Sequence, residues 1–251
     1  MRILLTNDDG IFAGGLRALY RVFSKSHDVT VVAPDRERSA IGHAITLHQP
    51  LRTQWIETGK GYGGYAVNGT PADCVKIAIL QIMDRRPDMV VSGINPGVNV
   101  GVNINYSGTV AAAKEASLYG INAIAVSIQK AGDDSRYAEV ADCMERFSRK
   151  VADKGLPFGS FLNVNFPDGP VNEAAGVRVC PQGIEPFKES MEKRIDPRNR
   201  PYYWQGCDAQ TFTRNPEADG SAVAGNYIAI TPMKCDTTDY DLMNELETMI
   251  S

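Results

Sequence analysis

Histidine, tryptophan and cysteine are scarce in this chain, and long hydrophobic runs are missing. The 251 residues include three histidines, two tryptophans and five scattered cysteines. The cysteines form no C-x-x-C pair and their number is odd, which argues against a disulfide framework or a zinc site. No apolar run approaches the roughly 20 residues that a membrane-spanning helix needs. We therefore expect reduced thiols and no membrane partner.

The charge balance gives no sign of a nucleic-acid partner. Lysine and arginine number 26 against 30 aspartates and glutamates, a formal net charge of −4. Such a chain has no broad attraction to a phosphate backbone, so an anionic substrate needs a local device. The first hydrophobic stretch is short and runs straight into Asn7, Asp8 and Asp9, unlike a signal peptide. The expected location is the cytoplasm.

Several common catalytic signatures are also absent. The chain has no G-x-S-x-G, no G-x-x-x-x-G-K-[ST] and no H-E-x-x-H sequence. Residues 59–64 do spell G-x-G-x-x-G, but this stretch neither follows a first strand nor opens a helix. We interpret it as a glycine-rich hairpin.

Two adjacent carboxylates stand at the end of the first hydrophobic run. Residues 3–5 predict a buried strand of a parallel sheet, and Asp8, Asp9 and Gly10 follow. Ligands of open α/β sheets bind beyond the carboxyl ends of strands, and Gly10 permits a turn there. Two close carboxylates repel, so one takes a proton or a divalent cation holds both. An acidic turn formed for local reasons is the alternative, which this segment does not exclude.

Strands and helices alternate through the first two thirds of the chain. Strands are predicted at 3–5, 29–33, 89–92, 123–128 and 161–166, and helices at 16–23, from Thr70-Pro71, from Ser107 and at 137–154. Because β-α-β units favour parallel pairing, we predict an α/β fold: a Rossmann-like, three-layer, open and mostly parallel sheet.

The composition changes after residue 167. Residues 168–225 are rich in Pro, Gly, Arg and Tyr, with little helical period. Further strands are expected at 177–179, 202–204, 210–212 and 227–231, the last ended by Pro232, and a short helix around Leu242, Leu246 and Met249. We divide the chain into a metal- and phosphate-binding core, 1–167, and a hairpin and tail region, 168–251, whose strand at 226–231 returns to the core. The hairpin and tail region has too little apolar surface to form a core of its own. We therefore expect it to pair with another subunit.

Polar groups follow the other strands at the same edge of the sheet. The loop 35–43 carries Ser39 and His43, although a solvated charged loop is the simpler interpretation. Asn95, in the Gly- and Asn-rich loop 93–101, offers a neutral oxygen ligand.

A helix is predicted to begin at Ser107. Its free N–H groups, the Ser107 and Thr109 hydroxyls and the close approach that Gly108 allows suit an anion or phosphate, with plain capping as the alternative. An oxygen-ligand site beside such a helix start indicates phosphoryl chemistry.

Four motifs in order resemble the SurE family, the survival-protein-E nucleotidases. They are Leu5 to Gly10, the loop from Pro34 to Ser39, Ser92 to Asn95 with Gly97, Asn99 and Gly101, and Tyr106 to Val110. The match continues through Asn68 to Pro71, Asp196 to Arg198, Tyr202 to Trp204 and Thr231-Pro232. Two departures are Ala116 and Asn199, which stand where glycine is usual.

The resemblance implies a 5′(3′)-nucleotidase that releases phosphate from nucleoside monophosphates. It implies a divalent ion, Mg²⁺ or Mn²⁺, and homodimers or homotetramers built by exchanging the C-terminal hairpin and tail. The implied metal ligands are Asp8, Asp9, Ser39 and Asn95. The expected phosphate contacts are Asn95, Ser107, Gly108 and Thr109.

Metal-activated water is the mechanism that we expect, with Asp8 and Asp9 as the catalytic residues and one of them as a candidate proton acceptor. A haloacid-dehalogenase-like phosphatase is one alternative, but such enzymes place the second aspartate two residues after the first. A nucleotide-binding module without turnover is the other, since sequence does not prove catalysis.

Overall fold

A nine-stranded sheet forms the centre of the computed structural model, which describes residues 1–59, 61–130, 133–184, 189–207 and 215–250. The strand order is β3-β4-β2-β1-β5-β6-β7-β11-β8, and all neighbours are parallel except β3–β4 and β7–β11. The strands are β1 (Arg2–Thr6), β2 (Asp28–Pro34), β3 (Thr53–Glu57), β4 (Gly63–Val67), β5 (Met89–Pro96), β6 (Asn122–Ile128), β7 (Ser160–Phe166), β8 (Val177–Val179) and β11 (Ile228–Lys234). The predicted α/β fold with a mostly parallel sheet is confirmed.

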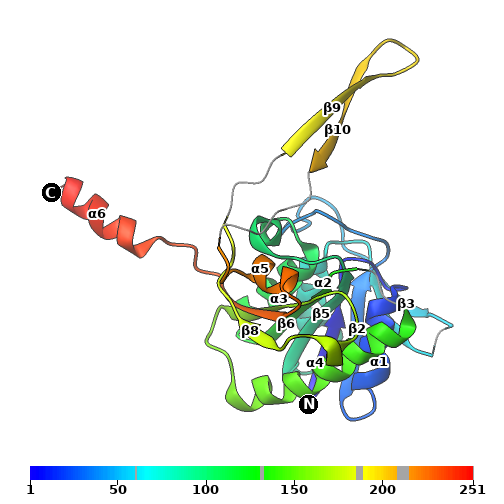
Figure 1. Cartoon of the computed structure of the whole chain (residues 1–251). Helices are drawn as coiled ribbons and strands as arrows, with labels where there is room; N and C mark the ends of the chain where they lie inside the picture. Colours follow the sequence, from blue (N-terminus) through cyan, green and yellow to red (C-terminus); the bar gives the residue numbers. More distant parts are fainter. Residues whose placement is uncertain (60, 131–132, 185–188, 208–214, 251) are drawn as a thin grey trace.

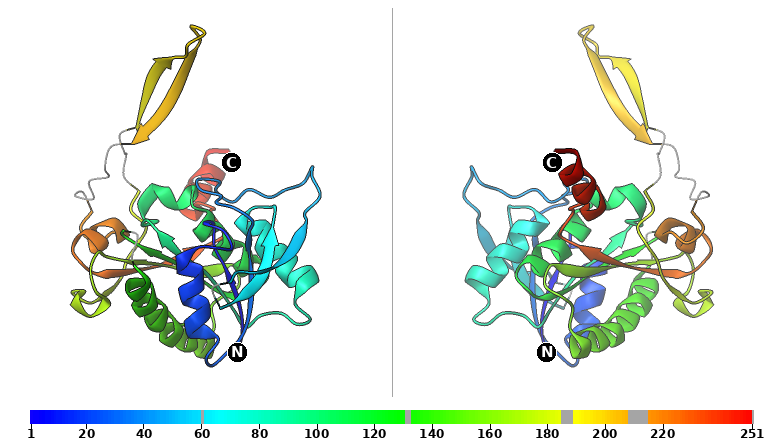
Figure 2. Two further views of the ribbon diagram at one scale, coloured as in Figure 1. Left: turned by 90° about the vertical axis from the view of Figure 1, so that its right-hand side faces the viewer. Right: turned by 90° about the vertical axis from the view of Figure 1, so that its left-hand side faces the viewer.

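Helices cover both faces of this sheet (Figures 1 and 2). α1 (Gly14–Phe23) and α4 (Asp134–Lys154) pack together on one face, and α2 (Pro71–Ile77) and α3 (Gly108–Leu118) on the other. In β1, Ile3 and Leu5 join the first core while Leu4 joins the second, and all three are fully buried. A strand buried on both faces reads as a continuous apolar run, which is why the period-two alternation is missing.

The sheet has a topological switch point between β1 and β5. Along the chain, β1 leads through α1 on one face, whereas β5 leads into α3 on the opposite face. Divergent connections leave a crevice beyond the carboxyl ends of two adjacent strands, where ligands of open α/β sheets bind. Asp8 and Asp9 follow β1, and Asn95 lies near the end of β5. The topology thus places these residues at one edge.

Shorter elements complete the structure. They are a π-helix (Ala78–Ile82), two 3-10 helices (Gly101–Asn105 and Val171–Glu173), α5 (Asp219–Ala224), the hairpin strands β9 (Glu189–Ile195) and β10 (Pro201–Cys207), and α6 (Tyr240–Ile250). No helix in the described part of the chain is long and apolar enough to cross a membrane.

The hairpin and the last helix stand away from the sheet (Figure 1). β9 and β10 pair in antiparallel fashion, and Tyr203 and Trp204 are largely exposed. Every residue of α6 is exposed as well. Asn199, one of the two departures, lies in the hairpin turn with a φ of 59°. Asparagine tolerates this left-handed conformation better than other non-glycine residues, so the turn forms without glycine.

Two predicted strand ends need correction. β11 does not end at Pro232: the strand runs to Lys234, with Pro232 opposite Leu162 of β7. On its other side β11 pairs with β8 from Ile228 only as far as Ile230. The missing N–H of Pro232 therefore interrupts no hydrogen bond to β8. β5 extends through Pro96 into the predicted loop.

The region after residue 167 contains two elements that periodicity missed, β9 and α5. β9 has apolar residues only at Met191 and Ile195, and α5 is only six residues long. The strand expected at 210–212 falls outside the described residues. The glycine-rich stretch 59–64 does connect a hairpin, since β3 and β4 pair antiparallel on either side of it.

Candidate functional site

The segment Asn7–Gly10, here called the carboxylate turn, is closed by its own first residue. The Asn7 amide accepts the Gly10 N–H at 3.1 Å and donates to the Gly10 carbonyl at 3.1 Å. Gly10 has a φ of 98°, and a Cβ there would lie 3.1 Å from the backbone of Arg36. The turn therefore requires glycine at this position. It ends strand β1 and places Asp8 and Asp9 in the same turn.

The first turn of α3 packs directly on Asp8. Ser107 is the N-cap, and its Oγ accepts the Val110 N–H at 3.1 Å. The Thr109 hydroxyl donates a hydrogen bond to Oδ1 of Asp8. A Cβ on Gly108 would lie 2.8 Å from the Asp8 Cβ, so only glycine allows this approach. The segment Ser107–Thr109, here called the α3 start, thus lies against the carboxylate turn, with the positive end of the helix dipole beside it.

Burial and mutual repulsion shape the electrostatics of the two aspartates. Burial raises the pKa of Asp8 above its ordinary value, although the Thr109 hydrogen bond opposes this. Burial, the charge of Asp8 and that of Glu37 raise the pKa of Asp9 to about 7. Oδ2 of Asp9 is buried and accepts no hydrogen bond from the described residues. Such a pair is stabilised by a proton or by a cation.

The loop after β2 reaches the carboxylate turn through its backbone. The Arg38 N–H donates to the Asp8 carbonyl at 2.7 Å. The Ser39 hydroxyl, in the next residue, donates to Glu37 and not to an aspartate. Glu37 was not among the predicted site residues, yet its charge acts on both aspartates. Nothing in a loop of alternating charges distinguishes it from a solvated side chain.

Asn95 lies on the neighbouring strand, with its side chain directed to its own loop. It pairs in register with Ser127 of β6, and its Nδ2 donates to the Gly97 carbonyl at 2.6 Å. It makes no hydrogen bond to either aspartate among the described residues. The structure therefore brings Asp8 into contact with the α3 start. The side chains of Ser39 and Asn95 bond instead to Glu37 and to the Gly97 carbonyl.

A buried polar network supports the loop that follows Asn95. The Asn99 N–H donates to Asn165 at 2.8 Å, its Nδ2 donates to Ser127 at 2.9 Å, and its carbonyl accepts from Asn163 at 2.8 Å. Two residues on, the Gly101 N–H donates to Asp219 at 2.9 Å. Sequence reasoning missed these supports. The alternation of Asn163 and Asn165 on an apolar strand was a usable signal, whereas Asp219 had none.

The four predicted oxygen ligands fit a hard divalent cation such as Mg²⁺ or Mn²⁺ better than a metal that prefers nitrogen or sulfur ligands. Within the described ranges, no three His, Cys, Asp or Glu side chains form a metal-binding group. Of the predicted ligands, Asp8 and Asp9 carry carboxylate oxygens, and Ser39 and Asn95 carry neutral ones. Ions such as Mg²⁺ take oxygen ligands and keep several waters, so one or two carboxylates suffice. The unpartnered Oδ2 of Asp9 is an atom that a cation would satisfy.

Comparisons with known proteins show which family the chain resembles. The family model described as "Survival protein SurE" matches residues 3–189. A protein named 5′-nucleotidase SurE from Desulfatibacillum aliphaticivorans is 55% identical over 247 residues, covering 98% of this chain and 97% of that protein. One with the same name from Syntrophobacter fumaroxidans is 48% identical over 246 residues, covering 98% of each.

A solved structure extends the likeness to the whole fold. The SurE protein from Aquifex aeolicus superposes with a TM-score of 0.85 at 37% identity, and the match covers 100% of both chains. Sequence and fold agree along the entire length. This chain belongs to the SurE family.

Proposed function

We propose that this protein is a metal-dependent 5′-nucleotidase that hydrolyses nucleoside monophosphates to nucleoside and phosphate, with 3′-monophosphates as further substrates. The observation that carries the proposal is the direct contact between the carboxylate turn and the α3 start. One side suits a divalent cation and the other a phosphate group. Relatives that share up to 55% of the sequence and bear the name 5′-nucleotidase support it.

We assign the metal ion to Asp8, Asp9, Ser39 and Asn95, with Mg²⁺ or Mn²⁺ as the ion. When bound, such an ion lowers the pKa of water and neutralises negative charge on the phosphoryl group. The Thr109 hydroxyl fixes the orientation of Asp8, and burial keeps bulk water from screening the pair. One of the two aspartates is our candidate for accepting a proton from the attacking water.

We assign the phosphate oxygens to the α3 start and Asn95. The first N–H groups of a helix have no intrahelical partner, so they can donate to an anion. Gly108 lets the first turn of α3 approach Asp8 closely, because a Cβ there would clash with the Asp8 side chain. Binding here would hold the phosphorus next to the carboxylate turn through backbone N–H groups and hydroxyls.

We also propose that residues 168–251 assemble the protein into dimers or tetramers. The support is the exposed apolar surface of the projecting elements. Tyr203 and Trp204 on β10 are more than half exposed, and so are Met249 and Ile250 on α6. Large side chains of this kind are common in the buried centres of interfaces.

Phosphate release tests the proposal. Purified protein is incubated with AMP or GMP and Mg²⁺ or Mn²⁺, and the same reactions are repeated with a chelator. We expect release that depends on the metal. Binding of nucleotide without release under any metal would instead indicate a binding module. Phosphate trapped covalently on Asp8 would indicate the haloacid-dehalogenase type.

A further inference from the structure

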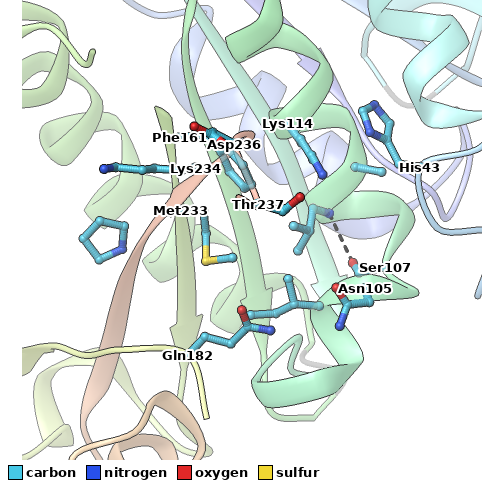
Figure 3. Close-up of a pocket in the computed structure, with 14 residues that line it drawn as sticks. His43, Asn105, Ser107, Lys114, Phe161, Gln182, Met233, Lys234, Asp236 and Thr237 are labelled. Atoms are coloured by element: carbon cyan, nitrogen blue, oxygen red, sulfur yellow. Dashed lines mark hydrogen bonds between the residues drawn. The ribbon is translucent and has the colours of Figure 1, made fainter. Parts of the chain in front are cut away.

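A cavity of about 400 Å³ lies along one side of α3 (Figure 3). Ser107, Val110, Ala111 and Lys114 line it at the spacing of a single helix face. Residues from the end of β11 and the chain beyond it, among them Met233, form the opposite wall. Its volume lies within the range of small-molecule sites, which are about 300–1,000 Å³.

The cavity is continuous with the α3 start. Ser107 lines the cavity and caps the helix, while the next two residues, Gly108 and Thr109, contact Asp8. A phosphate held at the α3 start therefore has the cavity beside it. Ser107 thus belongs both to the proposed phosphate contacts and to the wall of the cavity.

Apolar walls and two oriented amides give the cavity its chemistry. Ile104, Val110 and Met233 supply apolar surface that a flat aromatic ring can contact. Gln182 and Asn105 stand at the side of the 3-10 helix that spans Gly101–Asn105 (Figure 3).

Each amide has its nitrogen engaged by that helix. Nε2 of Gln182 donates to the Gly101 carbonyl at 2.8 Å, and Nδ2 of Asn105 donates to the Val102 carbonyl at 3.1 Å. A carbonyl accepts only from a donor, so these bonds fix which way each amide is turned. Figure 3 shows the oxygens on the cavity side. The two amides thus offer acceptors to N–H donors of a ligand, beside the charged side chains of Lys114, Lys234 and Asp236 that also line the cavity.

We propose that this cavity binds the nucleobase of the substrate, and that Gln182 and Asn105 favour bases that carry an exocyclic amino group. The inference rests on the proposed nucleotidase function. Adenine, cytosine and guanine present an amino group to such acceptors. Uracil presents carbonyl oxygens on either side of its ring N–H, and these are repelled. Ribose 5-phosphate, which has no base, leaves the cavity without a ligand.

The test compares kcat/KM for AMP, UMP and ribose 5-phosphate in the intact protein with Mn²⁺. For the wild type we expect a higher kcat/KM for AMP than for UMP. We expect the kcat/KM for AMP to exceed that for ribose 5-phosphate by about tenfold or more, because ribose 5-phosphate lacks the base's hydrogen bonds and buried ring. Gln182→Leu removes one acceptor and should cut the ratio of AMP to UMP about fivefold. Gln81→Leu, an exposed position away from the cavity, is the matched control and should leave the ratio unchanged.

A second variant fills the cavity from its rim, and a matched variant elsewhere serves as its control. Thr237 lines the cavity and is exposed, so Thr237→Trp should block the base without disturbing the core. We expect AMP turnover to fall at least about tenfold while ribose 5-phosphate turnover holds. Thr53→Trp, on the exposed strand β3, controls for an added indole ring. Calorimetric binding of adenosine, which has no phosphate, should likewise be lost only in Thr237→Trp.

The inference would be overturned if Thr237→Trp lost the same fraction of its activity on AMP, UMP and ribose 5-phosphate. A wild type that prefers ribose 5-phosphate to AMP would overturn it as well. So would a Thr237→Trp variant whose mass in solution changes while its substrate ratios do not, since the cavity would then belong to a subunit contact. Failure of the proposed function has a different signature. No phosphate would be released from any substrate, and adenosine binding would still report on the cavity.

Discussion

The Thr109 hydroxyl donates a hydrogen bond to Oδ1 of Asp8, although the two residues are 101 positions apart in the chain. Thr109 is fully buried and Asp8 nearly so. The bond joins the segment to which we assign the phosphate to the one to which we assign the metal, because it holds the Asp8 carboxylate against the first turn of α3. Five predictions follow from this and related contacts.

Thr109→Val should lower kcat/KM by about 10- to 100-fold, because a hydrogen bond to a charged group contributes about 1.5–3 kcal/mol. Valine fills the same space but cannot orient Asp8. Thr109→Ser keeps the hydroxyl and should recover most of the activity. Equal rates for the valine and serine variants, measured by phosphate release, would show that the bond does not position Asp8.

Asp8→Asn and Asp9→Asn should each weaken Mn²⁺ binding and reduce turnover by about 1,000-fold or more, since an ion's charge stabilisation amounts to several kcal/mol. Asn is nearly isosteric, so the fold should persist by circular dichroism. Asp28→Asn, at the exposed opposite end of the sheet, is the control. Calorimetric Mn²⁺ affinity close to that of the wild type would remove the aspartate from the ligand set.

The buried Glu115 should give the fold a pH-dependent stability. Burial raises its pKa, but hydrogen bonds from His43 at 2.7 Å and Lys76 at 3.0 Å outweigh this, so the pKa lies below its ordinary value of 4.5. A depressed pKa means that the contribution is present above the unfolded pKa and is lost as the pH falls through the folded one.

Glu115→Gln should therefore be less stable than the wild type by about 2 kcal/mol at pH 7, a typical value for hydrogen bonds to a charged group. The gap should shrink below pH 4. Urea unfolding midpoints at both pH values provide the measurement, with the exposed Glu173→Gln as control. A gap that stays constant with pH would contradict the assignment.

Asp219 is a fully buried carboxylate held by backbone donors. It accepts the N–H groups of Gly101 at 2.9 Å, Gly183 at 3.0 Å and Gly220 at 2.8 Å. Asp219→Ala leaves these donors unpaired and should destabilise the fold by about 3 kcal/mol. The neighbouring exposed Glu217→Ala should change stability by less than about 0.5 kcal/mol. Similar thermal midpoints for the two variants would show that water replaces the carboxylate.

Removal of residues 239–251 should shift the assembly to smaller species, because α6 buries none of its apolar side chains within its own subunit. The cavity beside α3 is left in place, since its lining ends at Thr237. Light scattering measures the mass. A mass per particle that falls only by the deleted residues would exclude α6 from the interface.

Local signals were sufficient for most elements of the first 167 residues. Thr70 caps α2 in a capping box with Asp73, and Ser107 caps α3, as the residue types predicted. The strand from Ile3 to Leu5 was readable because burial on both faces leaves an unbroken apolar run. Pro232 was misread because a proline stops a strand only where its N–H is needed, and that depends on which strand lies beside it.

What the sequence by itself determined is the chemistry at each strand end: adjacent carboxylates at Asp8 and Asp9, a turn that needs Gly10, and a capped helix start at Ser107. Only the tertiary structure decided which of these meet. The strand order β2-β1-β5 makes a switch point, and the first turn of α3 contacts Asp8 there. The charge of Glu37 acts on both aspartates, and Asp219 accepts a hydrogen bond from the Gly101 N–H. The physical reason is that capping and periodicity act over a few residues, whereas these contacts depend on strand order and crossovers that no local pattern specifies.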